Sequence, residues 1–285
     1  MSSHFVVRAS GLALLTLALG ASAALASETV TEPFVQSYPL AAGGKVSVAN
    51  TNGRVTIDAW DQAQVKVEAE KKVKADSRDR AQQILKEIKI QVDAHTNEVR
   101  IETKMPHRAN GSFWSWLSGS GVNASVEYHI HVPRRAVVAA ENTNGSVRLA
   151  GTQAAASVET TNGSVTVDQV AGDVRLRSTN GGLHATGVSG SVEAETTNGA
   201  IEVKLASLSA GKSNSFESTN GGISVQLPKD ARLSLDAETT NGGVSSDFAL
   251  EGGRSSRHSL SGNINGGGGR MTIRTTNGGI HVVKQ

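Results

Sequence analysis

Two histidines, His129 and His131, stand two positions apart in a segment of alternating polar and apolar residues. Side chains at i and i+2 of a strand point to the same face, so both imidazoles would share one face as potential metal ligands. A zinc site needs three or four ligands. The sequence has no cysteine, and no third ligand joins the histidines at a recognisable spacing. The sequence therefore predicts no metal site and no cofactor.

Other catalytic motifs are incomplete or missing. Gly211-Lys212-Ser213 matches the end of a phosphate-binding loop, but Ala206 stands where that motif needs a glycine. Neither Gly-x-Ser-x-Gly nor His-Glu-x-x-His occurs. A glycan-cleaving enzyme would need carboxylates clustered at one break in the surface, whereas the acidic residues recur evenly. The sequence therefore predicts no catalytic residue and a protein that is not an enzyme.

The tripeptide Thr-Asn-Gly is repeated eight times, first at Asn52. From Asn144 to Asn198 it recurs every 18 residues, and the later steps are 22, 21 and 36 residues. A fixed step that later lengthens is typical of stacked structural repeats with loop insertions. The asparagines from the second repeat onward form a predicted structural turn ladder of stacked amides: Asn144, Asn162, Asn180, Asn198, Asn220, Asn241 and Asn277.

Each turn lies between two segments of period-two alternation, which indicates strands. Aliphatic residues stand three and five positions after the asparagine, as Val165 and Val167 do, and four and six positions before it, as Val158 and Ala156 do. Asn-Gly also favours antiparallel hairpins, so a meander is the rival fold. Because equivalent residues recur in register through many copies, we expect an all-β, parallel β-solenoid or β-helix with rungs of about 18 residues.

The same register predicts an outward charged row three residues before each asparagine. Its acidic members are Glu141, Glu159, Glu195, Glu217 and Glu238. Arg177 interrupts this row, and Arg274 takes the position in the last repeat. An arginine between glutamates would relieve repulsion between like charges on neighbouring strands.

The chain divides into three predicted parts. Residues 1–26 combine Arg8, a short apolar run and small residues, as in a secretory signal peptide cleaved after Ala23 or Ala26. Residues 27–135 form a β region with one short amphipathic helix at about 77–89, capped by Asp76 or Ser77. Residues 136–285 form the repeat solenoid.

An aromatic loop at 111–119 is the candidate binding loop, through Phe113, Trp114, Trp116 and Leu117. The alternative is that this loop folds back and covers an open end of the solenoid.

The segment from Val126 to Pro133, followed by repeats of the type Glu-x-Thr-Asn-Gly-x-Val, resembles the bacterial putative-adhesin family of β-strand-repeat envelope proteins. The resemblance runs from about Lys45 to the end of the chain. It implies a periplasmic or surface β-solenoid, sometimes encoded beside envelope-stress regulators, with no agreed ligand and no catalytic residues to transfer. Some members carry a membrane anchor, and none is visible here.

Together these features predict an exported, non-enzymatic bacterial envelope protein, periplasmic or secreted to the cell surface. It would act as an adhesin-like binding or scaffold module that contacts an envelope polymer, another protein or its own copies. Without the leader, 27 basic residues face 26 acidic ones, and this near-neutral charge does not indicate nucleic acid. No further run is long enough to span a bilayer after signal cleavage. The alternatives are a β-helix polysaccharide lyase or hydrolase, and a periplasmic partner of an envelope-stress signalling system.

Overall fold

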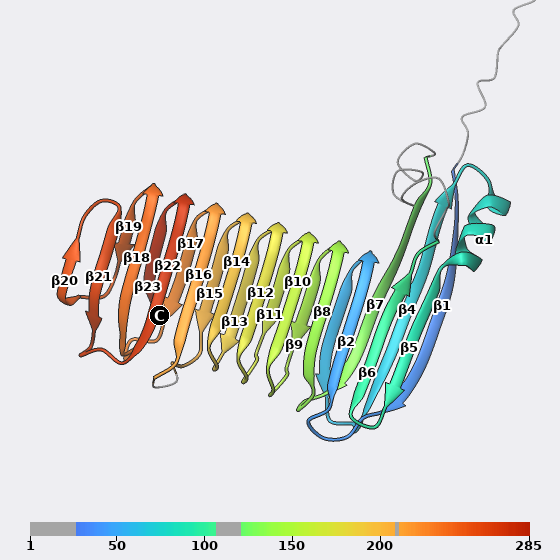
Figure 1. Ribbon diagram of the computed structural model, residues 1–285, viewed down its shortest axis with the longest axis horizontal. Coiled ribbons are helices and arrows are strands. Elements are labelled where there is room, and N and C mark those ends of the chain that lie inside the picture. The colour runs from blue at the N-terminus through green and yellow to red at the C-terminus, as the bar shows by residue number, and fades with distance from the viewer. Residues whose placement is uncertain (1–26, 107–120, 209–210) are drawn as a thin grey trace, which may run out of the picture.

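The computed structural model describes residues 27–106, 121–208 and 211–285. These residues form two elongated β-sheets that face each other, with a helix near one end (Figure 1). In spatial order, sheet A consists of β1 (Glu28–Pro39), β4 (Gln64–Ala75), β7 (Asn123–Pro133), β3 (Val55–Trp60), β9 (Val147–Ala150), β11 (Val165–Asp168), β13 (Leu183–Val188), β15 (Ile201–Leu205), β17 (Ile223–Leu227), β23 (Ile280–Lys284) and β19 (Val244–Ser246). Sheet B consists of β20 (Glu251–Ser255), β21 (Ser259–Ile264), β18 (Leu233–Asn241), β22 (Gly269–Asn277), β16 (Ser213–Asn220), β14 (Val192–Asn198), β12 (Val174–Asn180), β10 (Ala156–Asn162), β8 (Val137–Asn144), β2 (Lys45–Asn52), β6 (Glu98–Lys104) and β5 (Lys89–His95).

Each Thr-Asn-Gly repeat contributes one strand to each sheet. The chain runs along sheet B to the asparagine, bends at Asn-Gly and continues as a strand of sheet A. Successive repeats pair in parallel, with Asn162 of β10 opposite Asn180 of β12 and Val165 of β11 opposite Leu183 of β13. The arrangement is thus parallel and solenoid-like, as predicted, and the antiparallel meander is excluded for these strands.

The last repeats do not stack in sequence order. β22 and β23 lie between the β16/β17 pair and the β18/β19 pair, so the final repeat in the chain is the penultimate one in space (Figure 1). The intervening segment forms the antiparallel pair β20 and β21, and β21 covers the free edge of β18. The sequence pattern did not predict this exchange.

The core is a thin layer between the sheets. Alternate residues of each strand point inward, and aliphatic side chains such as Leu176 and Leu183 are fully buried there. Phe216 on β16 is the largest fully buried side chain among the described residues. Since each strand contributes only a few inward residues, backbone pairing and packing must stabilise the structure together.

One helix, α1 (Arg78–Glu87), forms where an amphipathic helix was predicted. Ser77 is its N-cap, and its hydroxyl accepts a hydrogen bond from the backbone amide of Arg80. Ala81, Ile84 and Leu85 are buried, and the helix packs against β1 and β4 at one end of the sheets. Across the described ranges, none of the helical structure has the length and apolar character required to cross a bilayer.

Candidate functional site

The Asn-Gly turns form one continuous edge of the solenoid. Along it, the side-chain amide of each asparagine beyond Asn144 donates to the amide oxygen of its neighbour on the side of Asn144: Asn162 to Asn144, Asn180 to Asn162, Asn198 to Asn180, Asn220 to Asn198, Asn277 to Asn220 and Asn241 to Asn277, at 2.8–2.9 Å. The bond that joins Asn277 to Asn220 spans 57 residues of sequence, and the bond that joins Asn241 to Asn277 spans 36. The ladder therefore continues through the exchanged repeats and holds the turns at one spacing.

The glycine after each asparagine is required by close stacking. A Cβ built on Gly181 would lie 1.9 Å from the carbonyl oxygen of Gly163 in the adjacent repeat. No side chain can be accommodated at that distance, so the turns stack in register only with glycine at this position.

A second row of polar side chains lies just inside the turns. The residue two positions before each asparagine is buried, and in six repeats its hydroxyl donates to a glycine carbonyl of the neighbouring repeat: Thr160, Ser178, Thr196, Ser218, Thr239 and Thr275, at 2.9–3.2 Å. This row was not among the features predicted from the sequence, although serine or threonine at an inward position of a period-two pattern indicates it. These bonds give each buried hydroxyl a partner and tie adjacent repeats together just inside the turns.

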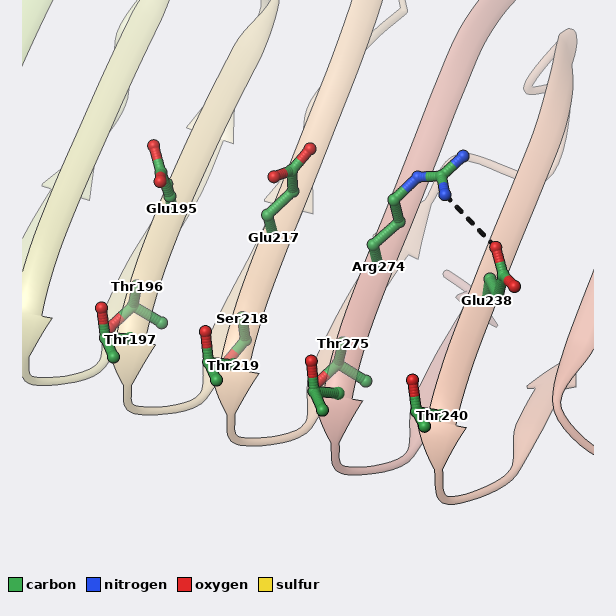
Figure 2. Close-up of a pocket in the computed structure, with 11 residues that line it drawn as sticks. Glu195, Thr196, Thr197, Glu217, Ser218, Thr219, Glu238, Thr240, Arg274 and Thr275 are labelled. Carbon is green, nitrogen blue, oxygen red and sulfur yellow. Dashed lines mark hydrogen bonds and ion pairs between the residues drawn. The ribbon is translucent and has the colours of Figure 1, made fainter.

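The outer face of sheet B beside this edge carries two exposed rows. One consists of the threonines that precede the asparagines: Thr143, Thr161, Thr179, Thr197, Thr219, Thr276 and Thr240. The other is the charged row, and Figure 2 shows Glu195, Glu217, Arg274 and Glu238 from consecutive strands above Thr197, Thr219 and Thr240. The two rows line a shallow groove, and a similar groove continues at the other end beside Glu141, Thr143, Glu159 and Thr161. We call the two rows together the threonine–glutamate face.

The strand exchange sets the order of charges on this face. Sequence order would place Arg274 after Glu238, at the end of the row. In the structure Arg274 lies between Glu217 and Glu238, and its Nη1 is 3.2 Å from Oε2 of Glu238. Arg177 likewise lies next to Glu195, with Nη2 3.4 Å from Oε2. The row therefore has an arginine after each of its first two pairs of glutamates and a single glutamate at its end, which limits repulsion between stacked carboxylates.

The remaining residues considered from the sequence are separate from this face. Phe113, Trp114, Trp116 and Leu117 lie outside the described residues. Lys212, in the sequence that matches part of a phosphate-binding loop, forms an ion pair with Asp173. The Lys212 ammonium, together with the backbone amide of Ser191, lowers the pKa of Asp173 to about 2. This loop residue therefore makes a structural contact between repeats.

The threonine–glutamate face can form many equivalent hydrogen bonds. Adjacent strands lie about 4.8 Å apart, so each step along the solenoid repeats a hydroxyl and a charged group at that interval. Threonine hydroxyls donate and accept, and carboxylates accept. Such a periodic surface can bind an extended molecule at several points at once, and along the described strands no cluster of carboxylates breaks the rows.

The chain was compared with curated proteins and with solved structures. A comparison with curated proteins gave no match. Among solved structures, a putative cell adhesion protein from Clostridium sporogenes has 15% identity and a TM-score of 0.35, over 89% of this chain and 100% of that one. A putative adhesin from Bacteroides fragilis has 11% identity and a TM-score of 0.42, over 89% of this chain and 96% of that one. A putative adhesin from Parabacteroides distasonis has 9% identity and a TM-score of 0.35, over 89% and 97%.

A match to a protein-family model shows the family of this chain. Residues 44–283 match the model described as Toastrack DUF4097, which covers the first repeat, the adjacent β region and all later repeats. The matched range agrees with the extent of the resemblance recognised in the sequence. The chain therefore belongs to the Toastrack DUF4097 family.

Proposed function

We propose that this protein is an exported, non-enzymatic binding or scaffold module of the bacterial cell envelope, and that the threonine–glutamate face contacts an extended envelope polymer. One observation carries the proposal: two exposed polar rows run in register along sheet B, from Glu141 to Glu238, at one strand per step. The leader-like residues 1–26 support export.

The physical basis is repeated weak contact on a rigid surface. One hydrogen bond contributes only about 0.5–1.5 kcal/mol net. Several such bonds formed by one polymer add, because the later contacts are intramolecular once the first has formed. The asparagine ladder and the inner hydroxyl row fix the spacing of the face before binding, so little ordering is needed on association.

Binding should be measured with the purified mature protein against peptidoglycan, lipopolysaccharide and capsular glycan preparations. The informative variant is Thr197→Val with Thr219→Val, which removes two hydroxyls from the centre of the face and keeps the side-chain shape. We expect affinity to fall roughly 5- to 140-fold, from two hydrogen bonds of about 0.5–1.5 kcal/mol each. The matched control is Thr186→Val, an exposed threonine at the end of β13 in sheet A, which should bind like the wild type.

Two further arms separate this proposal from its rivals. If reducing ends are released in the same wells, and Glu195→Gln with Glu217→Gln abolishes that release, the protein is a glycan-cleaving enzyme and the binding-module proposal is wrong. Binding that is lost in Trp114→Ala with Trp116→Ala but retained in the threonine variant would move the contact to the aromatic loop. Absence of binding to every preparation would refute the proposal.

A further inference from the structure

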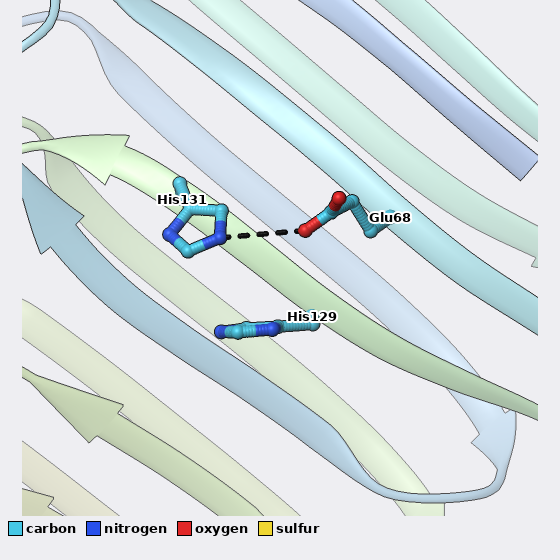
Figure 3. Close-up of side chains that lie close together, drawn as sticks. All are labelled: Glu68, His129 and His131. Carbon is cyan, nitrogen blue, oxygen red and sulfur yellow. Dashed lines mark ion pairs between the residues drawn. The ribbon is translucent and has the colours of Figure 1, made fainter.

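The outer face of sheet A carries a cluster of metal-ligand side chains. Glu68 of β4 lies beside His129 and His131 of β7, and one potential ligand atom from each lies within 4.8 Å of the other two (Figure 3). The two imidazole rings have centroids 4.4 Å apart. Glu68 precedes the histidines by about sixty residues, and antiparallel pairing of β4 with β7 sets it directly opposite His129. The tertiary structure thus supplies the third ligand that the sequence pattern lacks.

The neighbouring side chains hold this cluster in place. Glu68 uses its two oxygens differently, with Oε1 2.7 Å from the Lys66 ammonium and Oε2 3.4 Å from Nε2 of His131. The ring of His131 stacks on Trp60 at 5.0 Å between centroids, with 22° between the planes. The indole nitrogen of Trp60 in turn donates to the carbonyl of Gln64. His131 therefore has restricted freedom before any ligand arrives.

Asp58 of β3 adds a second carboxylate. Its Oδ2 lies 2.8 Å from Nε2 of His129. Histidine ligands commonly bind a metal through one ring nitrogen while the other nitrogen donates to a carboxylate, which fixes the ring. The set is also reachable from solvent, because the side chains of Glu68, His129 and His131 are 34%, 49% and 23% exposed.

We propose that Glu68, His129 and His131 form a binding site for a borderline divalent transition-metal ion, represented by Zn²⁺, with Asp58 supporting His129. Two imidazoles and one carboxylate suit zinc, whereas calcium and magnesium take oxygen ligands alone. Around a tetrahedral zinc with bonds of about 2.0–2.1 Å, ligand atoms stand about 3.4 Å apart. The ligand atoms lie within 4.8 Å of one another, and small rotations of the Glu68 and His129 side chains around the fixed His131 ring bring them to that distance.

A bound ion would cross-link β4 to β7, near the end of the solenoid that α1 covers. An ion that binds only the folded chain stabilises it by mass action. It would also leave coordination positions open to solvent or to a ligand group from a partner. This site is separate from the threonine–glutamate face, which lies on the other sheet.

The test is zinc titration by calorimetry on tag-free, EDTA-treated and desalted mature protein. We expect one Zn²⁺ per chain, a higher midpoint of thermal unfolding with Zn²⁺, and visible absorption bands on Co²⁺ substitution. His129→Gln with His131→Gln, or Glu68→Gln alone, should lower zinc affinity at least about tenfold.

The matched control is His184→Gln with His281→Gln, which removes two histidines from other strands of the same sheet face. His184 lies beside Glu202, and His281 contacts Ser245. This control should bind zinc like the wild type, and in EDTA all variants should unfold within about 2–4 °C of the wild type, because each loses only contacts of partly exposed side chains. The proposal is overturned by absence of zinc binding, by equal binding in the His129/His131 variant, or by equal loss in the control.

Discussion

Replacing Gly181 with alanine tests whether close stacking of the Asn-Gly turns holds the repeats together. The new Cβ would lie 1.9 Å from the carbonyl oxygen of Gly163, where contacts below 3.0 Å essentially never occur. The two turns must therefore separate by at least 1.1 Å, the difference between 3.0 and 1.9 Å, against a strand spacing of about 4.8 Å. That shift strains the backbone bond from the Gly163 amide to the Asn180 carbonyl and the side-chain amide bond from Asn180 to Asn162, which both join these two turns.

The expected cost is about 3–5 kcal/mol in the free energy of unfolding. Overpacking contributes about 1–3 kcal/mol, and two weakened hydrogen bonds contribute about 1 kcal/mol each. The assay is urea unfolding followed by circular dichroism, with hydrogen exchange to show whether amides near residue 181 open first. Exchange is needed because repeat arrays can unfold in part.

The control is Gly182→Ala, one residue along the same turn. Its nearest neighbour would be the end of the His184 side chain at 3.0 Å, and the equivalent position of the next repeat is already Ala200. We expect this variant to lose less than about 1 kcal/mol. If Gly181→Ala is no less stable than Gly182→Ala, close contact between adjacent turns does not require glycine after the asparagine.

Three further perturbations follow from the described contacts. Asn180→Ala removes two rungs of the amide ladder, to Asn162 and from Asn198, and should cost about 1–2 kcal/mol in urea unfolding, with no loss if the ladder is incidental. Phe216→Ala empties the largest buried position and should cost about 3–5 kcal/mol, whereas a cost below 1 kcal/mol would mean that the layer between the sheets is not tightly packed. Asp173→Asn tests the lowered pKa: since the folded pKa lies below the ordinary 3.8, the carboxylate stabilises the fold above about pH 4 and ceases to do so as the pH falls towards 2. The half-exposed pair with Lys212 is worth no more than about 1 kcal/mol, so urea midpoints of wild type and variant should differ slightly at pH 7 and converge near pH 2.

Repeat chemistry made much of the fold predictable. The inward residues Val158 and Val165 could be identified from period-two alternation around Asn162, and both are buried. The parallel stacking followed from equivalent turns in consecutive repeats, and helix α1 followed from a cap at Asp76 or Ser77, of which the structure uses Ser77, and from its apolar stripe. These features depend on residues close in sequence, where local geometry decides the outcome.

The exchange of the last two repeats could not be predicted in the same way. The long step between Asn241 and Asn277 is compatible with either a large insertion or a change of stacking order. Strands β18 and β22 could each pair with the free edge of β16, and in the structure β22 does so. The position of Arg274 between two glutamates depends on this pairing, so it cannot be predicted from the sequence of a single repeat.

The sequence by itself determined the alternating strands, the Asn-Gly turns that require glycine, and the family to which the chain belongs, because these depend on local spacing that recurs in register. Only the tertiary structure decided the order of the final repeats, the course of the threonine–glutamate face and the meeting of Glu68 with His129 and His131. In each case the deciding contact is a backbone pairing between strands distant in sequence, and such pairings are selected by the packing of the whole sheet.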